Sequence, residues 1–230
     1  MSGANGRRWP GGAALDHVPR AAGAEFAAQK KSLHASEQDR PDVVASRQAF
    51  RRRVARIDPK RLVFVDESGA NTVMTRTRAR APRGHRAVGA VPHGHWKTLT
   101  LLGALRLNGP VAGVTVNGPT DTDVFRLFVN DALAPALHRG DVVVWDNLAA
   151  HKAAGVMQTL AAHGARFLPL PPYSPDLSPI EPQWSKVKQV LRSVEARTPQ
   201  ALGQAAADAF AAITAKDARG WFRKCGYCVH

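Results

Sequence analysis

Short apolar runs and longer amphipathic segments alternate along this 230-residue chain. Short uninterrupted apolar runs indicate buried strands, and apolar positions repeating every three or four residues indicate helices. These patterns predict strands over 61–66, 72–77, 98–107, 111–116, 141–145 and 165–168. They predict helices over 39–57, 120–137, 150–163, 179–193 and 198–214. Early strands followed by alternating helices and strands predict an α/β fold. Its mixed sheet should be antiparallel in the early strands and parallel in the later ones, with helices on both faces.

Local turn and capping signals set several of these boundaries. Ser68-Gly69 predicts a turn after the first strand. The segment 79–94 contains two prolines and three glycines, so we expect a loop or a loose hairpin there. The helix over 120–137 should begin at a cap supplied by Thr120 or Thr122.

Composition divides the chain into an ordered part and a less ordered beginning. Residues 1–28 are rich in Gly, Ala and Arg without a period, so we expect them to be poorly ordered. Residues 29–60 should form a helical linker, 61–195 the α/β domain, and 196–230 helices that pack on it through Trp221 and Phe222. No apolar stretch is long enough to span a membrane, and the N-terminus lacks a secretion signal. Two cysteines make no disulfide framework, so we expect a cytoplasmic protein.

Charge adds the first indication of a partner. The chain carries 32 Lys and Arg against 18 Asp and Glu, a net charge of +14, which suits a polyanion. A generic basic protein would explain the total, but not the stretch between Ser68 and Thr120, which contains no acid. Phosphates would neutralise such a segment and give salt-dependent binding. We therefore predict nucleic-acid contacts from Arg76, Arg78, Arg80, Arg83, Arg86 and Lys97.

Two aspartates follow apolar strands closely. Asp66 ends the run RLVFVD, and Asp146 ends VVVWD. Sites in open α/β sheets form beyond the strand ends, which favours a functional role. A turn residue would also explain Asp66, and a helix cap would explain Asp146. Glu67 is a rival to Asp66, but alternation along a strand places it on the opposite face, and we prefer Asp66.

A purely structural role would also explain Glu181. Ser178-Pro179-Ile180-Glu181 matches a capping box with proline at the first helical position. The proline-rich loop before it, however, holds the start of the helix in a fixed place. Three acids from distant segments, each at the end of an element, would suit two Mg²⁺ ions acting on a phosphodiester, with Mn²⁺ as a substitute. Further DNA contacts are expected close to two of these acids, from His151, Lys152, Lys186 and Lys188.

The chain resembles the bacterial insertion-sequence transposases of the mariner superfamily, in the group written IS six-thirty. Four segments carry the likeness in order: RLVFVDESGANTVMTRTRARAPRGHRA, HGHWKTLTLLGAL, GDVVVWDNLAAHKAAGV and FLPLPPYSPDLSPIEPQWSKVKQVLR. The family's catalytic aspartate, aspartate and glutamate match Asp66, Asp146 and Glu181. The 34 residues between Asp146 and Glu181 equal the family's characteristic gap.

This resemblance implies an RNase H-like fold and metal-dependent DNA cleavage, followed by strand transfer into target DNA. It also implies a homodimer in the active complex and a bacterial, nucleoid-associated location. Family members carry N-terminal helix-turn-helix domains, and nothing before Lys30 is typical of one. We therefore expect end recognition to come from an upstream reading-frame product.

Two other functions remain open from the sequence: a non-catalytic DNA-binding remnant and an RNase H-like nuclease for RNA–DNA hybrids. Cys225 and Cys228 form a lone C-x-x-C, and a structural zinc site would need a second pair.

Overall fold

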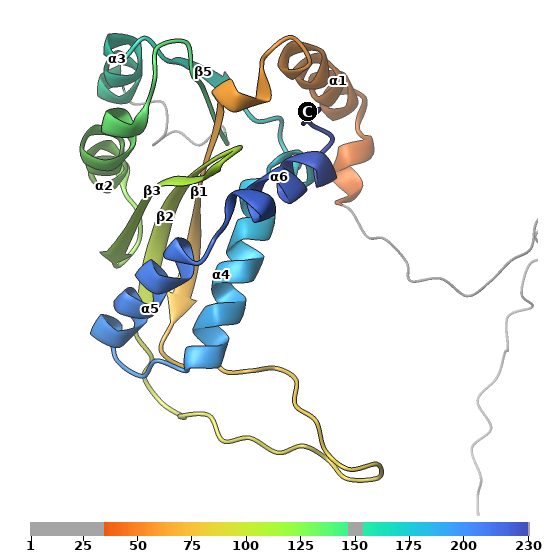
Figure 1. Ribbon diagram of the computed structural model, residues 1–230, viewed down its shortest axis with the longest axis vertical. Helices are drawn as coiled ribbons and strands as arrows, with labels where there is room; N and C mark the ends of the chain where they lie inside the picture. Colours follow the sequence, from red (N-terminus) through yellow and green to blue (C-terminus); the bar gives the residue numbers. More distant parts are fainter. Residues whose placement is uncertain (1–34, 147–153, 230) are drawn as a thin grey trace, which may run out of the picture. The chain divides into compact units, whose positions relative to one another are not determined.

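A five-stranded mixed sheet forms the centre of the computed structural model, which describes residues 35–146 and 154–229. The sheet order is β3-β2-β1-β4-β5 (Figure 1). The strands are β1 (Leu62–Asn71), β2 (Thr98–Arg106), β3 (Gly109–Asn117), β4 (Val142–Trp145) and β5 (Arg166–Pro169). The first three pair antiparallel, and β1, β4 and β5 pair parallel. The predicted mixed sheet is confirmed.

Helices cover both faces of this sheet. The helices are α1 (Pro41–Val54), α2 (Thr122–Leu127), α3 (Ala154–Ala162), α4 (Ile180–Val194), α5 (Pro199–Ala211) and α6 (Ala215–Lys224). On one face, Leu62 and Phe64 of β1 pack in a core with residues of α4, α5 and α6. On the other, Val63 and Val65 pack with residues of α2 and α3. Alternation along β1 thus divides the core into two layers. None of the described helices is long and apolar enough to cross a membrane.

The prediction of a turn at Ser68-Gly69 and a second strand over 72–77 is wrong. β1 continues to Asn71, because β2 offers an antiparallel partner along this whole length, from Val63 opposite Arg106 to Asn71 opposite Thr98. Ladder pairing therefore overrides the local turn preference of Ser-Gly. Residues 72–97 then leave the sheet as a long irregular loop, which we call the arm (Figure 1).

The helix predicted over 120–137 is shorter and irregular. Asp121 caps it, accepting a hydrogen bond from the Val124 amide at 2.8 Å, so neither predicted threonine is the cap. After Leu127 the chain widens into a π-helical segment over Phe128–Leu133 and then a 3₁₀ turn over Ala134–Ala136. Proline within this turn cannot donate the next helical hydrogen bond, which explains why the helix ends.

A buried ion pair fixes the entry to β4. Arg106 donates to the Asp141 carboxylate at 2.7 Å, and Asp141 is fully buried. The His138 amide donates to the same carboxylate oxygen at 2.7 Å. Since Arg106 ends β2 and Asp141 precedes β4, the pair joins two strands on either side of β1.

At the C-terminal end, α6 packs its aromatic side chain Phe222 into the core beneath β1. Phe222 is fully buried and meets Phe64 edge-on, with ring centroids 5.5 Å apart. Tyr227 contacts the same ring of Phe64 and donates a hydrogen bond to the Leu177 carbonyl at 2.7 Å. The turn before α4 is thereby attached to the chain's C-terminal part.

Candidate active site

Asp66 lies in the middle of β1, not at its end as the sequence pattern predicted. β1 pairs with β4 only through Leu62–Phe64, and beyond this point it pairs with β2 alone, with Asp66 opposite Gly103. The parallel part of the sheet therefore ends just before Asp66, although the strand itself continues. Extending the register of β1 and β4 by two residues brings Asp66 level with Asp146, which directly follows β4.

Glu181 occupies the first turn of α4, and it lies on the same face of the sheet as Asp66. The predicted capping box does not form, because α4 begins at Ile180 with Pro179 as its cap residue and without a side-chain cap hydrogen bond. The Glu181 amide donates to the Ser178 carbonyl oxygen at 3.2 Å, which is a backbone contact and not a side-chain cap. A role in a capping box therefore does not explain Glu181.

Trp184 connects α4 to β1. Its indole Nε1 donates a hydrogen bond to Asp66 Oδ2 at 2.9 Å. The same ring meets Phe210 of α5 edge-on, with centroids 5.6 Å apart, and it lies over Gly103 of β2. A side chain at Gly103 would occupy this space, so the glycine permits the close approach of α4 to the sheet.

Burial and neighbouring charges shift the pKa values of Asp66 and Glu181. The pKa of Asp66 is raised to about 7, first by burial and further by the Glu181 and Asp146 carboxylates, although hydrogen bonds from the Glu67 backbone and Trp184 oppose the rise. Burial also raises the pKa of Glu181, while Lys188 lowers it. The acids thus resist ionising together unless a positive charge joins them.

A polar cleft of about 370 Å³ opens beside these acids, between β1 and α4. It is lined by Asp66, Glu67, Ser68, Glu181, Trp184, Ser185, Lys188 and Arg192. Within residues 35–146 and 154–229, no three His, Cys, Asp or Glu side chains lie close enough to hold one ion together. Asp66 and Glu181 share the cleft, whereas Asp146 is level with Asp66 in the sheet register. Carboxylate oxygens are ligands that suit Mg²⁺, and a divalent cation would remove the repulsion that raises the pKa of Asp66.

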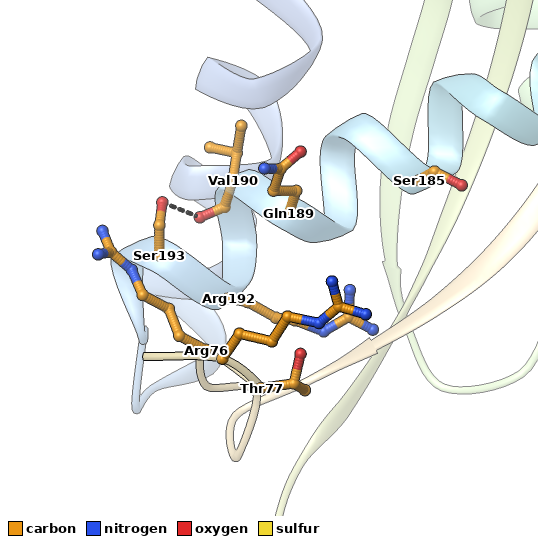
Figure 2. Close-up of a pocket in the computed structure, with 8 residues that line it drawn as sticks. Arg76, Thr77, Ser185, Gln189, Val190, Arg192 and Ser193 are labelled. Atoms are coloured by element: carbon orange, nitrogen blue, oxygen red, sulfur yellow. Dashed lines mark hydrogen bonds between the residues drawn. The ribbon is translucent and has the colours of Figure 1, made fainter. Parts of the chain in front are cut away.

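The predicted DNA-contacting residues lie in several places. Arg76 and Arg78, at the start of the arm, line a second cleft of about 670 Å³ against α4 (Figure 2). Farther along the arm, the predicted residues are exposed: Arg80, Arg83, Arg86 and Lys97.

Of the four remaining predicted contacts, the structure describes two, both on α4. Lys188 lies in the carboxylate cleft. Lys186 is paired with Asp217 of α6 at 2.6 Å, which gives it a structural role between two helices. His151 and Lys152 are outside the described residues, as is the N-terminal segment 1–28.

Comparison with known families gives an independent result. A family model described as DDE superfamily endonuclease matches residues 61–202, more than half of the chain. The chain belongs to the DDE superfamily endonucleases. No curated protein matches it.

Solved structures of the Mos1 transposase share the fold of this DDE endonuclease. The Mos1 paired-end complex with left transposon end matches with a TM-score of 0.67 at 20% identity, over 86% of this chain and 63% of that one. The pre-cleavage Mos1 transpososome matches with a TM-score of 0.68 at 18% identity, over 89% and 64%. The Mos1 catalytic domain with Raltegravir and Mg matches with a TM-score of 0.61 at 17% identity, over 84% and 92%.

These similarities confirm the predicted RNase H-like fold. The DDE endonuclease spans about 63% of the length of the Mos1 chain in the paired-end complex, and 92% of the Mos1 catalytic domain.

Two residues of the candidate site, Trp184 and Arg192, are not among those that the sequence pattern predicts. A usable signal exists for both, because residues three or four positions apart share a helix face. Trp184 follows Glu181 by three positions, and Arg192 follows Lys188 by four.

Proposed function

We propose that this DDE endonuclease domain is the catalytic part of a DNA transposase of the IS six-thirty group. It would cut the phosphodiester at the ends of a mobile element and join the freed 3′ end to target DNA. The observation that carries the proposal is the placement of the acids: Asp66 and Glu181 line one polar cleft, and Asp146 lies level with Asp66 in the register of β1 and β4. The raised pKa of Asp66 agrees with this placement, because strongly shifted carboxylate pKa values gather at functional sites.

Asp66, Asp146 and Glu181 are the proposed ligands of two Mg²⁺ ions, with Mn²⁺ as a substitute. When bound, such ions would activate the attacking oxygen and stabilise the leaving oxygen of the phosphodiester. Structures of the similar Mos1 transposase catalytic domain with Raltegravir contain Mg or Mn, which supports divalent-metal use.

The chain's own residues would prepare this site in distinct ways. Trp184 holds one oxygen of Asp66 in place through its indole hydrogen bond. Lys188 lowers the pKa of Glu181 and so favours the ionised form that binds metal. The flanking basic side chains would hold the DNA backbone, so that the scissile phosphate is positioned in the cleft.

The proposed partners follow from the reaction. Two element ends must be processed together, so we propose a homodimer in the active complex. The Mos1 structures include a paired-end complex with a transposon end, which supports this choice. We further propose that a separate helix-turn-helix product recognises the element ends, and that the protein acts at the bacterial nucleoid.

The test is a cleavage assay on duplex DNA that carries the element's own ends, with Mg²⁺ or Mn²⁺ and with or without the upstream product. Asp146→Asn should abolish strand cleavage and leave binding to non-specific DNA nearly unchanged, because it removes a proposed metal ligand and keeps the basic side chains that would hold the DNA backbone. Asp208→Asn, at an exposed position of α5, removes the same charge away from the cleft and should cleave like the wild type.

Two outcomes would contradict the proposal. Cleavage by Asp146→Asn would remove this aspartate from the chemistry. Cleavage of an RNA–DNA hybrid in preference to the DNA duplex would favour the RNase H-like alternative instead.

A further inference from the structure

The carboxylate cleft and the arm cleft are joined along α4. Ser185 and Arg192 line both of them, the first cleft with Asp66 and Glu181 and the second with Arg76 and Arg78. The two clefts are therefore neighbouring parts of one groove, with the acids at one end and the arm at the other.

The spacing of side chains on α4 explains how one helix can line this whole groove. Glu181, Ser185, Lys188 and Arg192 follow one another at intervals of four, three and four residues, which keeps them on one helix face. At a rise of about 1.5 Å per residue, this stripe is about 16 Å long. A strand of B-form DNA rises about 3.4 Å per nucleotide, so the stripe matches roughly five nucleotide steps.

The chemistry of the groove changes along its length. The lining of the arm cleft contains no acidic side chain. It combines arginines from the arm and α4 with hydroxyl and amide groups, among them Ser185 and Gln189 (Figure 2). Guanidinium, hydroxyl and amide groups are the usual donors to phosphate oxygens. The groove thus passes from metal-binding acids to phosphate-binding donors.

The root of the arm is attached firmly to the residues that follow α4. Arg197 donates to the carbonyl oxygens of Thr72 and Met74, at 3.1 and 3.0 Å. Glu195 pairs with Arg197 at 3.0 Å and accepts a hydrogen bond from the Thr75 hydroxyl. Arg76 follows immediately, so its backbone is held beside the C-terminal end of α4 before any ligand binds.

We propose that the α4 stripe and the start of the arm form a track for the DNA sugar–phosphate backbone leading away from the carboxylate cleft. Arg192 is the shared contact between the cleft and the track. This inference rests on the proposed function, because it takes DNA as the substrate. It adds Ser185, Gln189 and Arg192 to the DNA interface and gives the DNA backbone a direction along α4.

The test measures the salt dependence of binding to a fluorescently labelled DNA duplex of arbitrary sequence, by anisotropy and without divalent metal. Arg192→Ala should weaken binding and reduce the slope of log K against log salt by about one, the value for one lost phosphate contact. Arg192→Lys should retain most of the slope, because the charge remains. Arg223→Ala, on the exposed side of α6 and outside both clefts, is the matched control and should keep the wild-type slope.

A wild-type slope for Arg192→Ala, or an equal loss for Arg223→Ala, would overturn the track. Cleavage by Asp146→Asn, measured in parallel, separates the two proposals. If Asp146→Asn is inactive while Arg192→Ala binds normally, the track is wrong and the proposed function stands. If Asp146→Asn still cuts, the proposed function fails whatever Arg192 does.

Discussion

The Trp184 indole donates a hydrogen bond to Asp66 Oδ2 at 2.9 Å and so ties the helix that carries Glu181 to the strand that carries Asp66. Glu181 precedes Trp184 by three residues on the same helix, so one rigid element presents an acid and positions its partner. This contact couples the packing of α4 on the sheet to the geometry of the candidate metal site.

Removing the indole donor should therefore impair cleavage more than folding. Trp184→Phe keeps an aromatic ring but loses the hydrogen bond that lowers the pKa of Asp66. We expect activity or metal affinity to fall roughly 10–100-fold, as for other partners of metal ligands, and the acid limb of the pH–rate profile to move to higher pH. Phe210→Leu, which alters the ring packed on Trp184, should leave the acid limb in place. An unmoved limb in Trp184→Phe would contradict the positioning role.

Metal binding should change how stability depends on pH. The pKa of Asp66 is about 7 in the folded chain against 3.8 for the free group, so the folded state binds this proton more tightly than the unfolded state. Without metal, the stability that protonated Asp66 contributes is therefore lost as the pH rises from 3.8 through about 7. Mg²⁺ binds the ionised form, so it should raise the Tm more at about pH 8 than at about pH 5.5. Thermal unfolding with EDTA or Mg²⁺ measures this, and Asp66→Asn should abolish the difference.

The glycine beneath Trp184 should not tolerate a larger residue. A Cβ at Gly103 would lie 3.0 Å from Trp184 Cη2 and 3.2 Å from Gln183 Nε2. Gly103→Ala should therefore push α4 from the sheet, lower the free energy of unfolding by about 1–3 kcal/mol and reduce cleavage. Gly113→Ala is a matched control, since Gly113 pairs with Gly103 across the strands and its Cβ would meet Phe210 at an ordinary 3.6 Å. Equal loss of stability in both variants, measured by chemical denaturation, would refute the steric explanation.

The root of the arm should loosen when Arg197 is replaced. Arg197→Ala removes the hydrogen bonds to the Thr72 and Met74 carbonyls, both at the start of the arm. We expect faster tryptic cleavage at the arm arginines with little change in Tm, because these contacts lie outside the hydrophobic core. Lys216→Ala removes an exposed charge on α6 and should leave the digestion rate unchanged. An unchanged rate in Arg197→Ala would show that other contacts hold the arm.

Sequence patterns were sufficient for features that depend on local chemistry. The apolar run before Asp66 and the run before Asp146 marked two neighbouring strands of the sheet, because continuous apolar residues require burial on both faces. The alternation that separates Asp66 from Glu67 in the sequence also holds earlier in β1, where Leu62 and Phe64 lie on one face and Val63 and Val65 on the other. The acid-free basic stretch identified the segment that became the arm.

Errors arose where a distant partner decided the local structure. Ser68-Gly69 has a turn preference, but β2 continues beside it and offers ladder hydrogen bonds, so β1 extends to Asn71. Ser178 and Glu181 fit a capping box, but α4 starts without a side-chain cap. For β1, the preference of neighbouring residues is worth little against the contacts made across the fold.

The sequence by itself determined the two apolar strands that lead to Asp66 and Asp146, the basic character of the arm and the three acids proposed as ligands, because these depend on residue type and spacing. Only the tertiary structure decided that Trp184 holds Asp66 and that one face of α4 runs from Glu181 to Arg192 beside the arm. These relationships join residues far apart in the chain, and no local pattern of apolar and polar positions specifies which distant side chain will meet which.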